Sequence, residues 1–331
     1  DLTWEGGTTM NQEELETIVT APETGGVLIQ REGNFGSMAD AGRSYEATYR
    51  TPMGAHAHLE PEAALADATG DKVLVYASTQ APTADAGIIA DTLGIEADNI
   101  EVIATYLGGG FGCKAASTTA ADAARLSRAA DRPVHLGWTR EEDMIHGPTR
   151  PPTHNRFRAI INDENKIVGI DSGIASSDVI FSQFPGFVAS ILGADFLAAF
   201  GSTIYYTIPN IQVRYEHTKV PVPSGFWRGL GSFNNIFALE TFMDELAYEV
   251  EADPAAFRRQ HLPDTDLGER MRVALDAVME ASEWGTALPE GHGRGITVAF
   301  DRGTVVSLAA EASIEDDQIR VHHIWVAIDP G

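Results

Sequence analysis

In the stretch TYLGGGFGCKAAS, residues 105–117, glycines surround Phe111, and the chain's only cysteine and a lysine come directly after the last glycine. It comes after NIEVIATYL, residues 99–107, whose β-branched residues predict a strand. An alanine-rich helix is expected next, from about residue 115 to residue 130. Glycines let the backbone approach a neighbour closely, and the amides of such a loop can face a ligand at the positive end of a helix. The simpler alternative is a tight strand-to-helix turn that binds nothing.

Two familiar phosphate-binding motifs do not fit this loop. A P-loop has Gly immediately before its Lys, whereas here Cys113 precedes Lys114 and Ala115 takes the place of the Ser or Thr. The dinucleotide fingerprint has Gly at the sixth position from Gly108, where this chain has Cys113. The loop alone therefore identifies no ligand.

Outward from the loop, the first half of the chain alternates strands and helices. Strands are expected in KVLVYAST and PVHLGW, residues 72–79 and 133–138, and a helix in PTADAGIIADTLG, residues 82–94. Pro82 is typical of a first helical turn and Gly94 of a helix end. This order of elements is typical of an α/β arrangement.

The second half of the chain follows other patterns. HNRFRAIINDENKIVGIDSGIAS, residues 154–176, predicts two antiparallel strands around the turn NDENK. Helices are expected at residues 232–251, after Asp253-Pro254 and at about 266–284, and the chain then returns to strands. We therefore expect an α+β fold overall, with mixed sheets and packed helices.

These patterns divide the chain into three segments. We expect a partial N-terminal element or linker at 1–44, an α/β part with the GGGFG loop at 45–150, and a second α+β part at 151–331. The last boundary falls where GPTRPP punctuates the chain. Because the sequence starts without Met and stops at AIDPG, we expect a fold that is incomplete at both ends.

Composition limits the partners. The 331 residues include 48 acidic and 23 basic side chains, for a net charge of −25. This balance argues against nucleic acid and anionic membranes, because phosphate binding depends on clustered Lys and Arg. No apolar run approaches the length of a membrane span, so no membrane insertion is expected. One cysteine excludes a disulfide framework and any thiolate zinc or iron–sulfur site within the chain, and it leaves the compartment undecided.

A second constellation lies far along the chain. VPVPSGFWRGLGSFNNIFALETFMDELA, residues 220–247, places Arg228 beside two aromatic residues and a Gly-x-Gly, just before a long helix. Together with the glycine loop it resembles the molybdenum-binding large subunit of the xanthine dehydrogenase and aldehyde oxidase family, most closely the isoquinoline 1-oxidoreductase type. Other stretches resemble the family in the same order, namely AHAHLEPEAALA (55–66), STQAPTADA (78–86), WTREEDMIHGPTRPP (138–152), DPAAFRRQHL (253–262) and VHHIWVAIDPG (321–331).

The resemblance implies a cofactor. In this family the glycine loop lies against molybdopterin, commonly as its cytosine dinucleotide, and the pterin rather than the protein holds the molybdenum. Cofactor contacts are therefore implied for Gly109, Gly110, Phe111 and Gly112, and no metal ligand is expected from the chain. An acidic chain can still hold an anionic cofactor, since amide donors supply many of the contacts.

The resemblance also implies a reaction, the oxidative hydroxylation of an N-heteroaromatic compound or an aldehyde. Electrons would leave through 2Fe-2S clusters on a separate small iron–sulfur subunit. Arg228 would orient the substrate, because its planar charged fork can hold a carbonyl or a ring nitrogen. Arg258 resembles a second arginine near the metal and is a candidate cofactor contact.

The chain departs from the family pattern in places. The family's catalytic base is a Glu in a GVGE-type stretch that this sequence does not contain, so the 331-residue chain alone is expected to be inactive and free of molybdenum. Purine-oxidising relatives carry Glu where this chain has Ala115, which disfavours a purine substrate. Isoquinoline-type relatives often have two arginines at Cys113 and Lys114.

Two other classes of function stay open. On a strand, His56, His58 and Glu60 of HAHLE would share one face, and two His with a carboxylate are the ligands of non-haem iron oxygenases. The other class is a non-catalytic binding module whose glycine loop is only a turn. Metal analysis distinguishes the three hypotheses, because the molybdenum hydroxylase predicts molybdenum, the oxygenase predicts iron and the binding module predicts no metal.

Three further features are expected to be structural. Glu240 falls on the apolar stripe of the helix at 232–251, so a buried basic partner is expected for its carboxylate. Phe226 and Trp227 are expected to pack in a core. Cys113 is expected to be a small buried residue behind the glycine turn.

Overall fold

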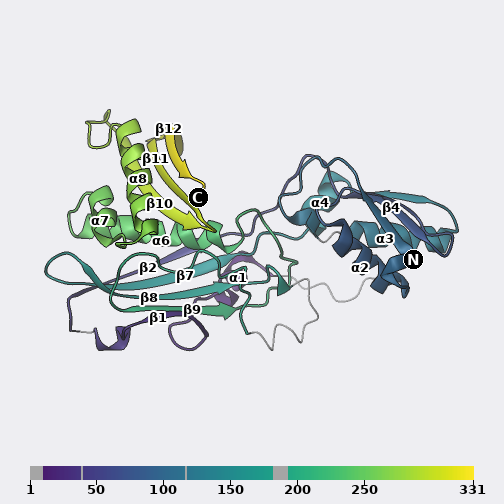
Figure 1. The fold of residues 1–331 in the computed structure, drawn as a ribbon, viewed down its shortest axis with the longest axis horizontal. Helices are drawn as coiled ribbons and strands as arrows, with labels where there is room; N and C mark the ends of the chain where they lie inside the picture. Colours follow the sequence, from purple (N-terminus) through teal and green to yellow (C-terminus); the bar gives the residue numbers. More distant parts are fainter. Residues whose placement is uncertain (1–9, 39, 116–117, 182–192) are drawn as a thin grey trace.

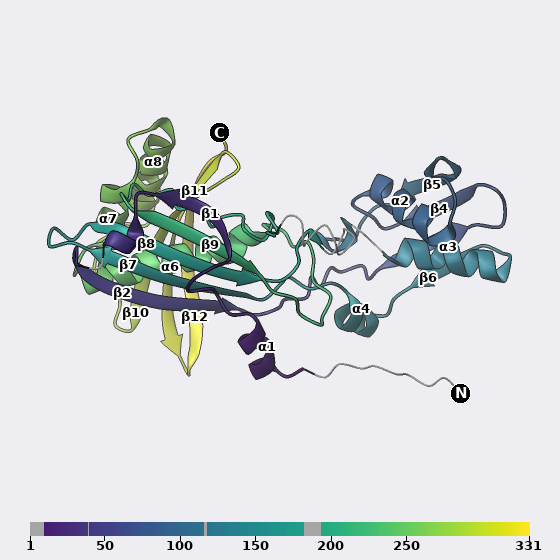
Figure 2. The same cartoon turned by 90° about the horizontal axis from the view of Figure 1, so that it is seen from below.

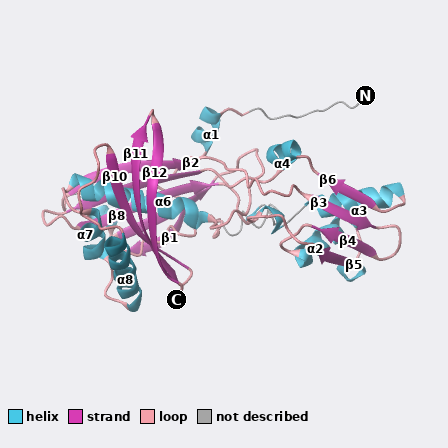
Figure 3. Cartoon of the chain, turned by 90° about the horizontal axis from the view of Figure 1, so that it is seen from above, coloured by secondary structure: helices cyan, strands magenta, loops and turns pink. Residues whose placement is uncertain are grey.

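The computed structural model describes residues 10–38, 40–115, 118–181 and 193–331. The described parts form two lobes of unequal size (Figure 1). Figure 3 shows that the connection between the lobes consists mostly of loops rather than of a shared sheet. None of the helices described has both the length and the apolar character needed to cross a membrane.

The small lobe is a four-stranded sheet covered by helices. Its strands are β3 (Ala63–Asp67), β4 (Val73–Ala77), β5 (Ile100–Ala104) and β6 (Val134–Gly137), in the order β5-β4-β3-β6. Only β4 and β5 are parallel; the other neighbours are antiparallel. The helices are α2 (Pro82–Leu93), α3 (Thr118–Ala130) and α4 (Arg140–His146). Helix α3 packs across β3, β4 and β6, and α2 packs against β5.

The large lobe is built on a five-stranded sheet. Its strands are β1 (Val27–Glu32), β2 (Arg43–Thr51), β7 (Thr153–Ile161), β8 (Ile167–Ser176) and β9 (Ile211–His217), in the order β1-β9-β8-β7-β2. β8 and β9 are parallel, and the other neighbours are antiparallel. The β7–β8 hairpin turns at Asn162–Lys166, as the sequence predicts. Both strands are almost entirely buried, so this hairpin is the centre of the lobe.

Helices and a second sheet complete the large lobe (Figure 2). They are α6 (Gly231–Glu249), α7 (Pro254–His261), α8 (Asp266–Ala281), β10 (His292–Asp301), β11 (Thr304–Glu315) and β12 (Gln318–Asp329). Helix α6 contacts β2 and β7 on one side and β10 on the other, while α8 packs on all three strands of the second sheet. Short 3-10 helices are η1 (Phe35–Ser37), η2 (Ala97–Asn99) and η3 (Cys113–Ala115).

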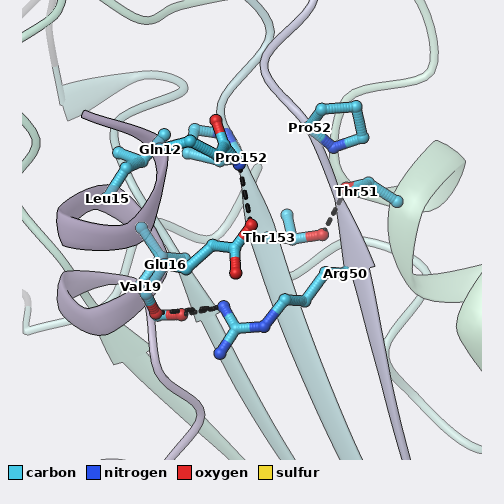
Figure 4. A pocket seen from close by; sticks show the side chains of 9 residues that line it. All are labelled: Gln12, Leu15, Glu16, Val19, Arg50, Thr51, Pro52, Pro152 and Thr153. Carbon is cyan, nitrogen blue, oxygen red and sulfur yellow. Dashed lines mark hydrogen bonds between the residues drawn. The ribbon is translucent and has the colours of Figure 1, made fainter.

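An N-terminal helix, α1 (Gln12–Ile18), lies against the ends of β2 and β7 (Figure 4). Leu15 and Val19 are buried there, and the Arg50 guanidinium donates 2.9 Å to the carbonyl of Val19. A pocket of about 200 Å³ lies between this helix and the strand ends. Asn11 caps the helix and shares a capping box with Glu14.

The α+β fold with mixed sheets is confirmed by these elements. The sheets nevertheless cut across the three expected segments: β1 and β2, from residues 27–51, pair with strands that follow residue 152. The sequence does not predict strand β3, because AALAD has few residues that favour strands. Pairing with β4 on one side and β6 on the other makes it a strand. Long-range pairing of this kind leaves no local signal in the sequence.

Candidate functional site

The glycine loop connects β5 to η3 and α3, and it adopts conformations that require glycine. Gly109 and Gly112 have φ angles of +96° and +109°, and Phe111 between them has φ +55°. A Cβ on Gly112 would lie 2.6 Å from the Phe226 carbonyl oxygen, and one on Gly110 would lie 2.4 Å from Gln80 Oε1. The glycines therefore make room first for other parts of this chain.

Those close neighbours hold the loop through hydrogen bonds. The Gly112 amide donates 2.9 Å to Gln80 Oε1, and the Gly108 amide donates 2.9 Å to Glu60 Oε2. The hydrogen bonds of the described residues leave the amides of Gly109, Gly110 and Phe111 without a partner in the chain. These three consecutive amides can donate hydrogen bonds to an anionic oxygen of a ligand.

The second constellation lies directly on this loop. The Arg228 amide donates 2.8 Å to the Phe111 carbonyl, which joins two motifs far apart in the sequence. Phe111 is 45% exposed, and Arg228 is exposed, with a guanidinium that bonds to no residue that the structure describes. Arg228 lines a cleft of about 840 Å³ together with Trp227, Phe233 and Asp301. A flexible, unpaired guanidinium at the rim of an apolar cleft can bind a polar group on a small molecule.

Trp227 is fixed from two sides. The His56 ring stacks on it with centroids 4.9 Å apart, and the Arg150 guanidinium lies 5.2 Å from its ring centroid. His56 Nε2 also donates to the Phe226 carbonyl, and burial lowers the pKa of this imidazole. Phe226 itself packs against the core of the large lobe. The core packing expected for this aromatic pair is confirmed for Phe226, whereas Trp227 stacks on His56 and lines the cleft beside Arg228.

A buried lysine braces the loop from below. Lys114 is fully buried, and its Nζ donates to the Glu60 carbonyl oxygen, to Glu60 Oε2 and to Ser78 Oγ at 2.7–2.9 Å. Burial opposes ionisation of Glu60, but hydrogen bonds from Ser78, the Gly108 amide and Lys114 outweigh it and lower the pKa of its carboxyl to about 2. The ion pair fixes the loop, and neither residue is free for proton transfer.

The sequence did not single out Gln80, Lys114 or Glu60 as supports of the loop. The available signal was Lys114, which comes two residues after the last glycine and does not fit a P-loop. If the turn is packed, such a lysine requires a buried partner. That partner is a carboxylate from a segment about fifty residues earlier, so only the fold identifies it.

The three side chains on which the alternative iron hypothesis depends do not converge on one point. Residues 52–53 and 55–62 form no strand, and Ala57 has φ +49°, so the alternation assumed for this stretch is wrong. His56 bonds to the Phe226 carbonyl, His58 Nδ1 to the Glu60 carbonyl, and the Glu60 carboxylate to Lys114. The three side chains serve three different contacts, which disfavours an iron site made from them.

Arg258 lies apart from the loop, inside the large lobe. Its guanidinium donates 2.8 Å to Glu240 Oε2, 2.8 Å to the Glu240 carbonyl and 2.6 Å to Asp244 Oδ1. Glu240 also accepts hydrogen bonds from the hydroxyls of Tyr205, Tyr206 and Thr297. The expected basic partner of Glu240 is therefore Arg258. The pair borders a cleft of about 350 Å³ that shares Ile236 and Phe237 with the cleft beside Arg228.

These features fit a cofactor that brings its own metal ligands. The loop offers amide donors, open conformations and a half-exposed aromatic ring, and none of its described side chains carries a free carboxylate or imidazole. Such a surface suits an anionic group held by backbone donors, with the metal ligated elsewhere on that group.

Comparisons with known proteins identify such a group. Residues 21–262 match the family described as molybdopterin cofactor-binding domain. The beta subunit of isoquinoline 1-oxidoreductase from Brevundimonas diminuta is 26% identical over 293 residues, which are 86% of this chain and 36% of that protein. A nicotinate dehydrogenase subunit from Pseudomonas putida is 29% identical over 258 residues, which are 75% of this chain and 21% of that protein.

Among solved structures, the aldehyde oxidoreductase of Desulfovibrio gigas has the same fold, with a TM-score of 0.64 and 24% identity. The likeness covers 89% of this chain and 34% of that one. The Cu,Mo-containing CO dehydrogenase is similar in fold as well, with a TM-score of 0.68 and 17% identity over 82% of this chain and 39% of that one. The chain thus spans only 21% to 39% of the length of these four proteins.

Proposed function

Because the chain belongs to the molybdopterin cofactor-binding domain family, we propose that it forms part of the catalytic large subunit of a molybdenum hydroxylase. The proposed reaction is the oxidative hydroxylation of an N-heteroaromatic compound or an aldehyde. Isoquinoline 1-oxidoreductase and nicotinate dehydrogenase are named for N-heteroaromatic compounds, and other relatives are named aldehyde oxidoreductase. These names support the substrate class.

One observation carries the proposal: the hydrogen bond between the Arg228 amide and the Phe111 carbonyl. It joins the loop that carries three amides without a described partner to the segment whose Arg228 lines the cleft. A cofactor on the amides and a substrate on the guanidinium would then be neighbours. Bringing reactants together in this way is a large part of what an enzyme does.

The residues of the chain have separable roles in this proposal. The amides of Gly109, Gly110 and Phe111 donate to anionic oxygens of the cofactor, and Gly112 keeps the loop close to Phe226. A molybdenum–pterin cofactor held there would supply the two-electron acceptor for hydroxylating the substrate carbon with an oxygen atom from water. We propose its cytosine dinucleotide form, since the open loop and the amide donors suit an extended anionic group.

Arg228 would stabilise negative charge that develops on a substrate carbonyl or ring nitrogen. Its position at the rim lets the guanidinium reach such an atom without displacing a protein partner. Trp227 and Phe233 line the same cleft and would exclude water from it, which strengthens the electrostatic effect of the guanidinium.

Arg258 has a different part in the proposal. Its bonds to Glu240, Asp244 and the Pro254 carbonyl leave one N–H of the guanidinium for a further contact. We propose that it positions α6, which carries cleft residues Phe233 and Phe237, and that it approaches the cofactor with that single donor at most.

The electrons from the reaction need an acceptor outside this chain. We propose a small iron–sulfur subunit with 2Fe-2S clusters as the partner. Relatives are named as subunits of their enzymes, among them a beta subunit and a molybdenum-binding subunit, which supports a protein made of several chains. The catalytic base would come from a part of the protein outside this sequence.

The test uses the intact enzyme with its cofactor. Arg228→Lys should lower kcat about ten- to a hundredfold, because it removes charge-assisted hydrogen bonding of about 1.5–3 kcal/mol. Molybdenum per enzyme, measured by elemental analysis, should not change. Arg302→Lys is the matched control, since Arg302 lines the same cleft but lies on the Phe200 ring, and it should keep turnover within about twofold.

Unchanged turnover in Arg228→Lys would refute the substrate role of this arginine. A wild-type protein with iron instead of molybdenum would support an oxygenase, and a protein that takes up neither metal would support a binding module. Both of these outcomes contradict the proposed function as a whole.

A further inference from the structure

Behind the glycine loop, three buried side chains of different chemistry meet. His58, Glu62 and Cys113 each offer one metal-binding atom, and these atoms all lie within 4.8 Å of one another. The residues are only 1%, 4% and 5% exposed. Asp143 of α4 extends the group, because its Oδ1 lies 3.4 Å from His58 Nε2. None of these four side chains has a role in the function proposed above.

The hydrogen bonds of His58 fix which of its nitrogens carries the proton. Nδ1 lies 2.6 Å from the Glu60 carbonyl oxygen, which can only accept, so Nδ1 is the donor. Nε2 then presents a lone pair toward Asp143 Oδ1, and neither of these buried atoms has a hydrogen-bond partner among the residues that the structure describes. Two acceptors that face each other away from water require a cation between them, either a proton on Nε2 or a metal ion.

The other members of the group favour a metal ion over a proton. A proton on Nε2 would satisfy His58 and Asp143 alone. The Glu62 carboxylate and the Cys113 thiol lie within 4.8 Å of each other and of a ring nitrogen of His58, and both are groups that commonly bind metals. The nearby cations already have partners: Lys114 bonds to Glu60, and Arg140 bonds to the second oxygen of Asp143, which leaves Asp143 Oδ1 facing His58. A divalent cation would attract both buried carboxylates of the group at once.

We propose that His58, Glu62, Cys113 and Asp143 bind a zinc ion. Zinc prefers four ligands from nitrogen, sulfur and oxygen, at bond lengths that place the ligand atoms about 3.3–3.8 Å apart. The 3.4 Å between His58 Nε2 and Asp143 Oδ1 lies within this range. The ligand atoms of His58, Glu62 and Cys113 lie within 4.8 Å of one another, so side-chain rotations that draw these three and Asp143 together would complete the site. Four protein ligands in a buried place make a structural rather than a catalytic site.

The surroundings of His58 support the assignment. A metal-bound imidazole usually donates its other N–H to a carboxylate or a backbone carbonyl, as His58 donates to Glu60. The Cys113 thiol now donates to Glu62, and its proton would leave to solvent when the zinc–sulfur bond forms. The ion would tie α4 and the segment around His58 to the first residue of η3, and so hold the glycine loop in place.

The proposed site departs from the expectation that one cysteine excludes a thiolate zinc site. The ligands come from three separate parts of the chain, so no motif with regular spacing marks them in the sequence. A mixed set of one sulfur, one nitrogen and two oxygens is recognisable only after folding.

The experiment measures zinc binding to the purified protein directly. After incubation with zinc and removal of excess, elemental analysis should find about one zinc per chain. Chelator competition should show that Cys113→Ser weakens the affinity roughly a hundredfold or more, since even the loss of a group that supports a ligand costs ten- to a hundredfold. The matched control is His135→Gln, an exposed histidine of the same lobe, which should bind zinc like the wild type.

Two further measurements keep the result decisive. Cobalt in place of zinc should give a thiolate charge-transfer band that Cys113→Ser lacks, and zinc should raise the Tm of the wild type but not of this variant. If Cys113→Ser does not fold, Asp143→Asn takes its place and should weaken zinc binding. Zinc retained equally by wild type and ligand variants, or no zinc bound by the wild type, would overturn the proposal. Neither result bears on molybdenum content.

Discussion

In the large lobe, Phe157 and Phe242 stack with ring centroids 5.1 Å apart, inside a core of Ile, Leu, Phe and Tyr side chains. The core of the small lobe is mostly alanine, with Ile89 as its largest buried side chain. Large apolar side chains contribute about 1.5–3 kcal/mol each when buried, and alanine contributes far less. The small lobe therefore depends less on packing and more on specific polar contacts.

The polar contacts of the small lobe gather where function is proposed. Lys114, Glu60, Gln80 and His58 all bond to the glycine loop or to the segment that supports it. Hydrogen bonds and ion pairs fix direction, whereas apolar packing is nondirectional. The large lobe thus supplies most of the stability through apolar packing. The small lobe buries less apolar surface and instead orients backbone donors through polar contacts.

The largest expected effect is the loss of stability when each of the two buried cations, Arg258 and Lys114, is replaced. Arg258→Met should lower the free energy of unfolding by about 3–5 kcal/mol, because it leaves Glu240 buried without its cation. Lys114→Met should cost less, since the Glu60 side chain is 35% exposed and water can replace part of the lost contact. Urea denaturation measures both. The matched control is Arg259→Met, which breaks an exposed pair with Asp276 and should cost less than about 1 kcal/mol.

Equal losses for Arg258→Met and Lys114→Met would break the comparison, because the small lobe would then depend on its ion pair as strongly as the large lobe does. A larger loss for Lys114→Met would reverse it.

Acid should affect the two lobes in different pH ranges. Burial, with Arg50 and Arg156 nearby, lowers the pKa of His154 in the large lobe from 6.5 to about 4. Below pH 6.5 the unfolded chain takes up a proton that the folded chain refuses, so stability falls by up to about 3 kcal/mol as the pH drops to about 4. Glu60 in the small lobe has its pKa lowered from 4.5 to about 2, so its contribution is lost only between these values.

Urea denaturation at a series of pH values checks this order. His154→Gln should flatten the decrease between pH 6.5 and about 4, since Gln can still accept from the Ala21 amide and has no proton to gain. His135→Gln, at an exposed position, should leave the curve unchanged. A wild-type protein equally stable at pH 6.5 and pH 4 would contradict the assignment of neutral His154.

The glycine loop offers a smaller effect that isolates the contact between the lobes. Gly112→Ala should cost about 1–3 kcal/mol, because φ is +109° and the new Cβ would meet the Phe226 carbonyl at 2.6 Å. Gly87→Ala in α2 should instead stabilise by about 0.5–1 kcal/mol, since nothing lies within 4 Å and alanine favours a helix. Thermal denaturation of both variants checks the opposite signs. A harmless Gly112→Ala would show that the lobes are not in contact there.

Much of the fold could be predicted because its signals are local. The hairpin turn NDENK, the proline and glycine at the ends of α2 and the apolar stripe of α6 are all confirmed by the structure. Strand β1 and the pairing of β2 could not be predicted, because they join the five-stranded sheet through partners more than a hundred residues away. Nonlocal pairing depends on the whole fold and not on the strand's own residues.

The site divides in the same way. The resemblance of the sequence to the xanthine dehydrogenase and aldehyde oxidase family is confirmed by the comparisons. The basic partner expected for Glu240 is found in Arg258. The strand on which the iron alternative depends is absent at HAHLE, since Ala57 adopts a positive φ that no composition signals. The supports Gln80 and Lys114 were missed, because their partners come from other segments of the chain.

The smallest expected effect is on stability at the proposed centre of function. Arg228 is exposed and has no described side-chain partner, so Arg228→Lys should change the free energy of unfolding by less than about 0.5 kcal/mol. The same variant is expected to lose about ten- to a hundredfold in turnover, because lysine lacks the planar fork. Parallel urea denaturation and kinetics of the intact enzyme measure both numbers on one protein. A loss of stability comparable to that of Lys114→Met would mean that Arg228 is a structural residue of the junction between the lobes. Stability without turnover, in contrast, is the behaviour of a side chain that the fold presents to a substrate and does not itself need.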